Sequence, residues 1–368
     1  MLRLTRMLVL LFVAVGLVGC GGGDEDNEAA TTAAKAAAPV TKGPGGESPT
    51  PSKDVRLTPE EVAKVKQGHY TAALLWHTQA AFTEAVTAGA RDEFKRLGID
   101  VIAQTNAEFD AAKQASDVET VLAKKPDIIV TLVIDPVSGA QAFRPAVKAG
   151  VKLVFLSNVP QGYEQGKDYV GIVTDDLAGM GKAAAELLGD AMDGKGKVGW
   201  MFHDATYYVT NQRDKAFKAW IQQKYPDIEI AAQGGVADPA KAEEVANGML
   251  TRNPELDGIY TPWATPAEGA LSALRSAGKS DAKLVTLDLD PTIALDMIQG
   301  GNTVGIAADL AYELGRTMAT EGAYGVLGKN APPFTIVPAI KVTKDNVVQA
   351  WQASLHQKPP RQVLDALR

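Results

Sequence analysis

A loop near residue 76 combines two aromatic side chains with an imidazole. Residues 71–75 form a short apolar run of strand length, and from Phe82 onward apolar side chains recur at helical spacing. Trp76, His77 and Phe82 therefore lie in or beside a loop between a predicted strand and a predicted helix. In open α/β sheets, loops that leave the carboxyl ends of strands form the ligand crevice. We expect these three side chains to face a bound molecule, with packing beneath the crevice as the alternative.

Other polar and aromatic side chains follow predicted strands in the same way. Asp135 ends a β-branched run that predicts a buried strand, although Asp-Pro is also an ordinary start of a turn. Tyr207 and Tyr208 follow a later strand, and we expect one of them to face the crevice. Asp288 also follows a predicted strand, where it either binds hydroxyl groups of a ligand or, like Asp290, caps the next helix.

Motifs for catalysis or cofactor binding are absent from the sequence. The run from Gly194 to Gly199 matches G-x-G-x-x-G, but its glycines precede a predicted strand, so a phosphate would not meet a helix N-terminus. The four histidines lack metal-ligand spacing, and no Walker A, H-E-x-x-H or G-x-S-x-G sequence occurs. We therefore expect a protein that is not an enzyme and that needs neither a cofactor nor a metal.

The elements that position these side chains are strands and helices in alternation. One round of alternation runs from residue 71 to about residue 190, and a second round of similar size begins at Lys197. This pattern predicts an α/β protein with parallel sheets that carry helices on both faces. A length of 368 residues is comfortable for two such units, and the net charge of -7 gives no indication of nucleic-acid binding.

The first 20 residues have the features of an export signal. Arg3 and Arg6 precede an apolar run that is too short to span a bilayer. The sequence Leu17-Val18-Gly19-Cys20 looks like a bacterial lipobox, in which Cys20 receives a lipid and becomes the mature N-terminus; a chance cysteine beside a signal peptide is the alternative. Two or more acyl chains anchor a protein stably. We expect a membrane-anchored lipoprotein in the periplasm or on the cell surface.

Residues 21–56 are rich in Gly, Ala, Thr, Pro, Ser and acidic side chains, and they contain few large apolar ones. Such a composition buries too little surface to fold. We predict a disordered tether between the lipid anchor and the folded region.

The folded region resembles the ribose/galactose-type periplasmic sugar-binding proteins of bacterial ABC importers, over about residues 70–342. The phrases that carry the resemblance are 86–94, 123–130, 211–217, 258–274 and 278–288. Repressors of the lactose-repressor type share the lobes, but a DNA-binding helix-turn-helix stands where this chain has its lipobox and tether.

The resemblance implies a two-lobed type I periplasmic-binding-protein fold. Each lobe is expected to be a parallel sheet sandwiched by helices, and the chain is expected to cross between lobes near Thr174, Ala308 and Val337. The lobe bounds that it implies are 69–174 with 309–335 for the N-terminal lobe and 175–308 with 336–368 for the C-terminal lobe. Thr174 and Asp175 then border the first crossing, where they are expected to be hinge residues.

The resemblance also implies a ligand site in the cleft between the lobes. Phe82 falls on an aromatic that stacks on the ligand, and Asp288 falls on a hydroxyl-binding aspartate. Five positions depart in residue type: Ser157 and Asn158 replace an acid and an arginine, Asn211 a ligand-holding arginine, Trp263 an asparagine, and Asp309 a hinge glutamine. Burial as a plug is the alternative for Trp263. Arg213 matches a neighbouring position, to which we assign a structural role.

The function that follows is capture of a monosaccharide or polyol by hinge closure, and its delivery to an ABC permease by a monomeric binding protein. Fewer arginines and the presence of Trp263, His77 and carboxylates favour a neutral polyhydroxylated ligand. A cationic amine held by cation–π contacts, Asp288 and Asp309 is one alternative. A sugar-sensing receptor for chemotaxis or a two-component system is another, and an enzyme would need paired carboxylates across the cleft.

Overall fold

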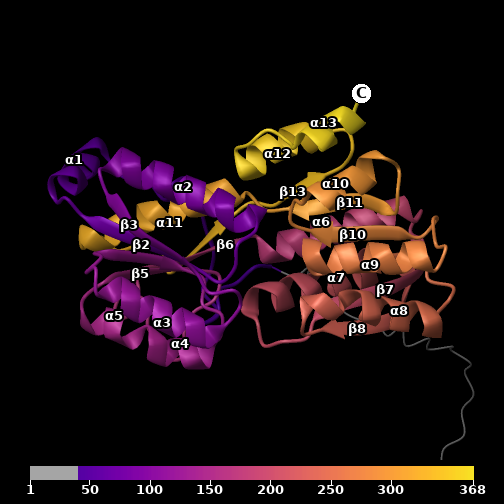
Figure 1. Cartoon of the computed structure of the whole chain (residues 1–368), viewed down its shortest axis with the longest axis horizontal. Helices are drawn as coiled ribbons and strands as arrows, with labels where there is room; N and C mark the ends of the chain where they lie inside the picture. Colours follow the sequence, from indigo (N-terminus) through magenta and orange to yellow (C-terminus); the bar gives the residue numbers. More distant parts are fainter. Residues whose placement is uncertain (1–39) are drawn as a thin grey trace, which may run out of the picture. The chain divides into compact units, whose positions relative to one another are not determined.

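The structure, a computed structural model, describes residues 40–368. These residues lie in one compact unit and form two β-sheets flanked by helices (Figure 1). The first sheet has the order β1-β12-β6-β5-β4-β2-β3, and its neighbouring strands are all parallel. Its strands are β1 (Thr50–Pro51), β2 (Thr71–Trp76), β3 (Asp100–Asn106), β4 (Ile128–Thr131), β5 (Lys152–Leu156), β6 (Gly171–Asp175) and β12 (Phe334–Val337).

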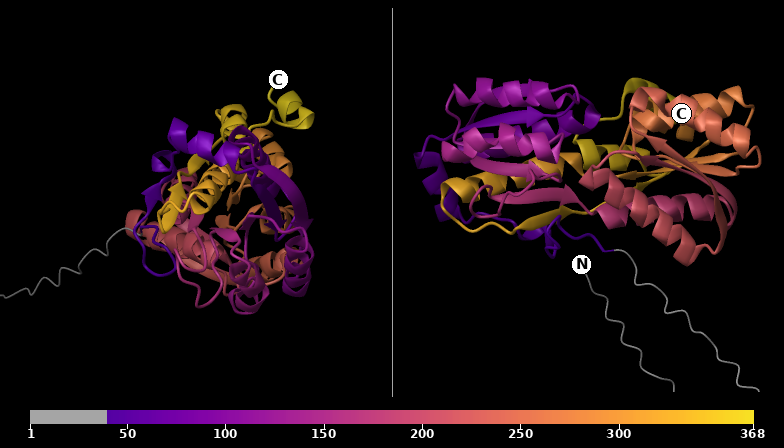
Figure 2. Two further views of the ribbon diagram at one scale, coloured as in Figure 1. Left: turned by 90° about the vertical axis from the view of Figure 1, so that its left-hand side faces the viewer. Right: turned by 90° about the horizontal axis from the view of Figure 1, so that it is seen from below.

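The second sheet has the order β13-β11-β10-β9-β7-β8. Its pairs are parallel except for β11 and β13, which run antiparallel. Its strands are β7 (Lys195–His203), β8 (Asp227–Val236), β9 (Gly258–Tyr260), β10 (Lys283–Leu287), β11 (Thr303–Ala308) and β13 (Ile340–Val342). In the view from below, the two sheets lie side by side (Figure 2).

Helices bury both faces of the first sheet. Alternate residues of β2 point to opposite sides, so Leu74 packs with α2 and α11 while Ala73 and Leu75 pack with the cluster that contains α3 and α5 residues. The helices of this sheet are α1 (Pro59–Gln67), α2 (Ala81–Leu97), α3 (Ala111–Leu122), α4 (Pro136–Ala142), α5 (Arg144–Lys148) and α11 (Ala311–Val326).

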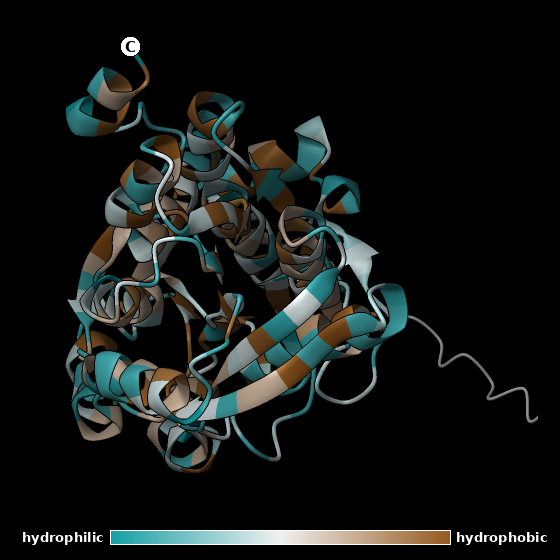
Figure 3. Cartoon of the chain, turned by 90° about the vertical axis from the view of Figure 1, so that its right-hand side faces the viewer, coloured by the Kyte–Doolittle hydropathy of each residue, from teal (hydrophilic) through white to brown (hydrophobic). Residues whose placement is uncertain are grey.

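The second sheet is covered in the same manner. Trp200 of β7 and Tyr260 of β9 pack with helices α6 and α7, and Ile259 packs on the opposite side with α8, α9 and α10. The bounds of these helices are α6 (Leu177–Ala191), α7 (Tyr208–Lys224), α8 (Ala242–Arg252), α9 (Ala264–Ser276) and α10 (Pro291–Ile298). Several of these helices alternate between hydrophobic and hydrophilic stretches, as expected for helices that bury one side on a sheet (Figure 3).

The chain passes between the sheets three times. It leaves the first sheet after β6 and enters α6, returns after β11 to form α11 and β12, and leaves again between β12 and β13. The crossings predicted near Thr174, Ala308 and Val337 coincide with these connections. The predicted α/β architecture of two helix-covered sheets is therefore confirmed.

The predicted tether at 21–56 does not extend to residue 56. β1 adds a parallel edge strand to β12, the side chain of Ser52 is buried, and Val55 is buried in the core. Earlier in the segment, the buried Thr41 hydroxyl accepts a hydrogen bond from Ala178 N at 2.8 Å and donates one to Asp176. The composition argument failed here because backbone pairing and a hydroxyl cap fix a segment that has few large apolar side chains. The rest of the predicted tether, 21–39, and Cys20 lie outside the described residues.

The C-terminal segment touches helices of both sheets. α12 (Val347–Leu355) contacts α2 and α11, whereas α13 (Arg361–Ala366) contacts α10 (Figure 1). Trp351 and Leu355 of α12 are buried. The predicted assignment of 336–368 to the C-terminal lobe therefore omits the packing of α12 on helices of the first sheet. Among residues 40–368, no helix has both the length and the apolar character needed to cross a membrane.

Candidate functional site

Most of the predicted site residues follow the carboxyl ends of strands in both sheets. In parallel sheets these ends meet at one edge, which is where ligands bind. On the first sheet these residues are His77 after β2, Asp135 after β4, and Ser157 and Asn158 after β5. Asp175, which was predicted as a hinge residue, ends β6 at the same edge. On the second sheet they are Tyr207 after β7, Trp263 after β9, Asp288 after β10 and Asp309 after β11.

Arg213 of α7 forms hydrogen bonds to one residue of each group, Asp175 at the first sheet and Asp288 at the second. Its side chain is 5% exposed, its Nη2 donates a hydrogen bond to Asp175, and its Nη1 donates to Asp288 Oδ1 at 3.2 Å. Asp175 belongs to the first sheet and Asp288 follows a strand of the second, so the guanidinium bridges the two. The structural role predicted for Arg213 is thus incomplete, because the residue lies within the candidate site. We call Asp175, Arg213, Asp288 and Asp309 the charge cluster.

The carboxylates of the charge cluster differ in their preference for a proton. Burial and the charges of Asp288 and Asp175 raise the pKa of Asp309 well above its usual range, against the opposing effect of Arg213. Burial also raises the pKa of Asp288, although Arg213 partly offsets it. For Arg213, burial disfavours the charge, but the three carboxylates outweigh burial and raise its pKa. Arg213 is therefore a permanent cation, and Asp309 is the carboxyl that most readily holds a proton.

Several buried polar side-chain atoms without a partner lie at this edge of the sheets. Most buried polar atoms of folded proteins have a hydrogen-bond partner, so each exception needs an explanation, such as strain, a functional role or a bound water or ion. Among residues 40–368 they include Asn158 Oδ1, Asp175 Oδ1, Arg213 Nε and Asp309 Oδ2. The Tyr207 hydroxyl lies near the Asn158 amide without a hydrogen bond of normal geometry. Donors and acceptors from both sheets are thus left without a protein partner at this edge.

Aromatic rings lie at the carboxyl ends of β7 and β9, where the hydroxyl of Tyr207 is buried near Arg213. The His203 ring contacts Trp263 edge-on at 4.9 Å between centroids and Tyr207 at 5.4 Å. Trp263 is half-buried, so part of its ring is accessible, and half-buried Phe82 begins α2 on the first sheet. His203 also lines a cavity of about 470 Å³. His203 was not among the predicted site residues, although its place at the carboxyl end of β7 is the same signal that identified Asp288.

Two predicted aromatic site residues pack into the protein instead. Trp76 is 2% exposed, and its indole Nε1 donates to Thr87 Oγ1 at 2.7 Å. His77 is buried against Phe109, with ring centroids 5.1 Å apart, and burial lowers its pKa to about 4. Its Nδ1 has no partner in the described chain. Trp76 therefore follows the packing alternative, and His77 is a neutral imidazole near physiological pH.

Three other predicted polar residues already hold local structure. Asp135 caps α4 by accepting hydrogen bonds from Ser138 N and Ser138 Oγ, both at 2.7 Å. Asn211 accepts from Tyr207 N and donates to His203 O, each at 3.1 Å, and so shapes the loop between β7 and α7. Ser157 Oγ and Thr174 Oγ1 are 2.7 Å apart. These contacts leave Asp135, Asn211 and Ser157 with less capacity for a ligand than the charge cluster has.

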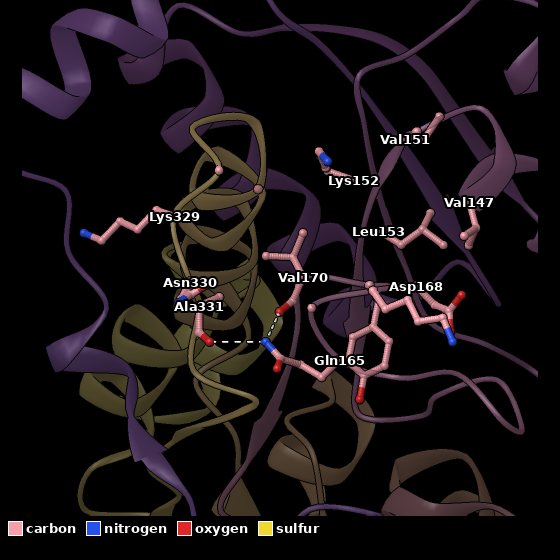
Figure 4. A pocket seen from close by; sticks show the side chains of 16 residues that line it. Val147, Val151, Lys152, Leu153, Gln165, Asp168, Val170, Lys329, Asn330 and Ala331 are labelled. Carbon is pink, nitrogen blue, oxygen red and sulfur yellow. Dashed lines mark hydrogen bonds between the residues drawn. The ribbon is translucent and has the colours of Figure 1, made fainter.

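A separate hollow of about 480 Å³ lies at the opposite edge of the first sheet (Figure 4). Lys152 and Val170, beside the amino ends of β5 and β6, line it together with Lys329 after α11. Gln165 Nε2 donates there to Val170 O at 2.7 Å and to Ala331 O at 3.3 Å. This hollow lacks the unpaired buried atoms of the charge cluster, so we do not assign the ligand site to it.

Comparisons with known proteins identify the family of the chain. Residues 71–330 match the family model described as a periplasmic binding protein domain. The chain is 26% identical over 261 residues to the ribose import binding protein RbsB of Bacillus subtilis (strain 168), covering 71% of this chain and 82% of that protein. It is also 26% identical over 267 residues to the xylitol-binding protein of Mycolicibacterium smegmatis, covering 68% of this chain and 73% of that one.

Solved structures share the fold. An ABC transporter solute-binding protein from Agrobacterium vitis, bound with α-D-tagatopyranose, has a TM-score of 0.70 at 24% identity and covers 78% of this chain and 98% of its own. An ABC transporter solute-binding protein from Mycobacterium smegmatis with bound glycerol has a TM-score of 0.67 at 23% identity. It covers 79% of this chain and 99% of its own. With the family model spanning most of the folded residues, the chain belongs to the periplasmic binding protein domain family.

Proposed function

We propose that the protein is an extracytoplasmic solute-binding protein that captures a monosaccharide or polyol and delivers it to the permease of an ABC importer. The observation that carries the proposal is the set of unpaired buried donors and acceptors at the carboxyl ends of strands from both sheets. Each sugar hydroxyl both donates and accepts, so one ligand can satisfy atoms of both kinds. The ligands named for the ribose-binding, xylitol-binding and tagatopyranose-bound relatives support this ligand class.

The binding step follows from the placement of the groups. A ligand ring lies against Trp263 and Phe82, its hydroxyls donate to Asp288 and Asp309, and one hydroxyl oxygen accepts from Arg213 Nε. Movement about the three crossings closes the two lobes over the ligand and removes water from the hydrogen bonds. Closure is favoured only by the contacts that the ligand gains in the closed form. The closed monomer then docks on the permease, and no catalytic step is required.

The location of the protein rests on its first residues, which lie outside the described part of the chain. We infer export by residues 1–20 and lipid attachment at Cys20, which anchors the protein in the periplasm or on the cell surface. Replacing the cysteine, as in Cys20→Ser, is expected to move the protein from the membrane fraction to the soluble fraction after cell lysis. Membrane association that persists in this variant would contradict the lipid anchor.

Thermal unfolding of the full-length protein against pentoses, hexoses, inositols and linear polyols tests the ligand class. Ligand at about 100 times its Kd adds about 2.7 kcal/mol to the free energy of unfolding, so the midpoint is expected to rise by several degrees. A rise with one sugar or polyol class supports the proposal and identifies the ligand. The absence of any rise across the panel would contradict it.

A further inference from the structure

The charge cluster contains more carboxylates than cations. Asp175, Asp288 and Asp309 share Arg213, which is the cation that the structure places against them among residues 40–368. The imidazole of His77, which follows β2, adds no second cation, because burial lowers its pKa to about 4. With all four groups ionised the cluster carries a net charge of about -2, from three carboxylates and one guanidinium. An uncompensated buried charge is costly, so the site favours either a proton or a positive ligand.

Among the unpaired buried atoms at this edge, hydrogen-bond acceptors outnumber donors, just as carboxylates outnumber cations in the charge cluster. Three of them are acceptors: Asp175 Oδ1, Asp309 Oδ2 and Asn158 Oδ1. Arg213 Nε is an unpaired donor, and the Tyr207 hydroxyl acts in either role. A primary ammonium group has three donors and no acceptor, so it matches the excess of acceptors. A ligand hydroxyl still suits Arg213 Nε, which needs an acceptor.

The aromatic rings at the carboxyl ends of β7 and β9 suit a cation as well as a sugar ring. Trp263 is half-buried, and its ring contacts His203 edge-on at 4.9 Å between centroids. An organic cation over the face of an indole gains cation–π attraction, and the C–H face of a ring gains contact area. The indole of Trp263 can therefore take either part of an aminated polyol.

A metal ion is a poorer occupant than an organic cation. Among residues 40–368, the structure brings no three His, Cys, Asp or Glu side chains close enough to hold a metal ion. The carboxylates of the charge cluster are spread around Arg213 instead of converging on one point. A ligand with its own chain of atoms can reach groups that are separated in this way.

We propose that the cleft prefers a polyhydroxylated ligand that carries one primary amine, an amino sugar or amino polyol, with its ammonium against Asp309 and Asp175 and its hydroxyls against Arg213 and Asp288. The inference rests on the proposed function, because it assigns the ligand class of the same site. It goes beyond the neutral ligands named for the relatives.

Binding of an ammonium group should depend on pH, because the carboxyl groups of the charge cluster take up protons as the pH falls. The groups that face Asp309 and Asp288 are Asp175 from β6 and Arg213 from α7. Behind Arg213, Asp214 accepts hydrogen bonds from the Tyr260 hydroxyl at 2.7 Å and from His203 N at 2.9 Å, and burial raises its pKa to about 7. Since the pKa values of Asp288 and Asp309 are also raised, acid conditions neutralise the cluster and remove its attraction for an ammonium.

Calorimetric titration of the full-length protein with matched pairs tests the preference. The pairs are D-glucosamine with D-glucose, D-galactosamine with D-galactose, and 1-amino-1-deoxy-D-glucitol with D-glucitol. At about pH 7.5 we expect the amine of at least one pair to bind about tenfold or more tightly than its neutral partner, which corresponds to about 1.4 kcal/mol. Lowering the pH to about 5 is expected to reduce this advantage, because the carboxylates gain protons.

Two isosteric variants separate the ammonium contact from general effects. Asp309→Asn keeps the shape and polarity of the side chain but removes its charge. It is expected to weaken neutral sugars, which lose a charge-assisted acceptor, and to weaken amines more, so that the advantage of the amine disappears. Asp290→Asn is the matched control, since Asp290 caps α10 through Thr292 N and Ile293 N. It is expected to retain the advantage.

The outcomes distinguish this inference from the proposed function. Neutral members that bind as tightly as their amines, or more tightly, overturn the amine preference and leave the sugar-binding function intact. An amine advantage that survives in Asp309→Asn also overturns it. Failure of every amine to bind overturns the preference, and failure of the neutral sugars and polyols as well overturns the proposed function.

Discussion

At the scale of single residues, the account depends on a buried arginine between carboxylates. Arg213 lies 38 positions from Asp175 and 75 positions from Asp288 along the chain, yet it donates hydrogen bonds to both. Removing one member of a buried ion pair leaves the other unpaired, which costs several kcal/mol. The ion pairs of the charge cluster therefore hold its members in place.

Asp288→Asn tests the ligand role of this cluster. The change removes a charge-assisted acceptor for a ligand hydroxyl, and we expect the Kd for the sugar identified by thermal unfolding to rise about tenfold or more. Asp135→Asn is the matched control: this carboxylate caps α4 through Ser138, so the variant is expected to lose some stability and to keep its affinity. Equal affinities in the two variants would contradict the assignment of Asp288.

Glu321 predicts a pH dependence of stability. Its side chain is fully buried, Thr335 Oγ1 donates to its Oε1 at 2.7 Å, and burial raises its pKa to about 8 from 4.5. The folded state holds the proton of Glu321 more tightly than the unfolded state does. The protonated side chain therefore makes its full contribution to the free energy of unfolding below about pH 4.5, and this contribution is lost as the pH rises toward about 8. This loss is on the order of 4 kcal/mol.

Glu321→Gln is expected to remove the decrease in the free energy of unfolding at higher pH, because glutamine keeps a hydrogen-bond acceptor for Thr335 and does not ionise. Urea unfolding between about pH 5 and about pH 8 measures the effect. Glu119→Gln, an exposed change in α3, serves as the control and is expected to follow the wild-type profile. A wild-type profile in Glu321→Gln would contradict the assignment.

The role of Arg213 was not predictable from sequence, for a physical reason. An arginine in an amphipathic helix has the same local pattern whether it faces solvent or a cleft, and its partners come from distant strands. Asp288 was predictable because the end of a parallel strand fixes its place. Trp76 and Asn211 have structural roles instead. An indole can fill a core and an amide can hydrogen-bond the backbone of a loop as readily as either can bind a ligand, and sequence alone does not distinguish these roles.

At the scale of elements, two helices of the first sheet pack closely through glycine. A Cβ added to Gly315 of α11 would overlap the carbonyl oxygen of Val86 in α2, and one added to Gly89 of α2 would overlap Tyr312 O. Backbone atoms cannot move aside as a flexible side chain can. The close approach of α2 and α11 therefore depends on the absence of side chains at both positions.

Gly315→Ala is expected to separate these helices and lower the free energy of unfolding by about 2 kcal/mol or more, as overpacking does. Gly248→Ala is the matched control in α8, where an added Cβ would meet only the Arg252 guanidinium at 3.6 Å or beyond. The same substitution there is expected to stabilise the protein by about 0.5–1 kcal/mol through helix propensity. Chemical denaturation measures both, and stabilisation by Gly315→Ala would contradict the packing described.

The alternation of strands and helices was predictable because buried parallel strands leave continuous apolar runs and their helices leave apolar residues at helical spacing. Ile128–Thr131 is such a strand, with all of its residues buried. The edge strand Thr50–Pro51 was not predictable, because two residues in a Pro- and Ser-rich segment carry no periodicity. Its pairing with β12 depends on backbone groups, which every sequence has.

At the scale of the whole molecule, both described ends of the chain touch the helices of the second sheet. The N-terminal segment contacts α6 through Thr41 and then pairs with the first sheet through β1. At the other end, α12 packs on α2 and α13 then contacts α10. These contacts add to the three crossings as links between the sheets. Any closing motion of the lobes must carry these two segments with it.

Thr41→Val is expected to release the N-terminal segment from α6. The change keeps the shape of the side chain but removes the hydroxyl that accepts from Ala178 N and donates to Asp176, at a cost of about 1 kcal/mol. Limited proteolysis and thermal unfolding detect the loss, and Ser48→Val, an exposed change in the same segment, is the control. Identical cleavage of the two variants would contradict an anchoring role for Thr41.

The central claim is that a sugar or polyol binds at the charge cluster, and the position of the bound ligand tests it most directly. A crystal structure with the ligand identified by thermal unfolding is predicted to show its ring against Trp263 and its hydroxyls within hydrogen-bond distance of Arg213 Nε, Asp288 and Asp309. A ligand found in the hollow beside Gln165, or one that leaves Arg213 Nε and Asp309 Oδ2 unpaired, would contradict the account.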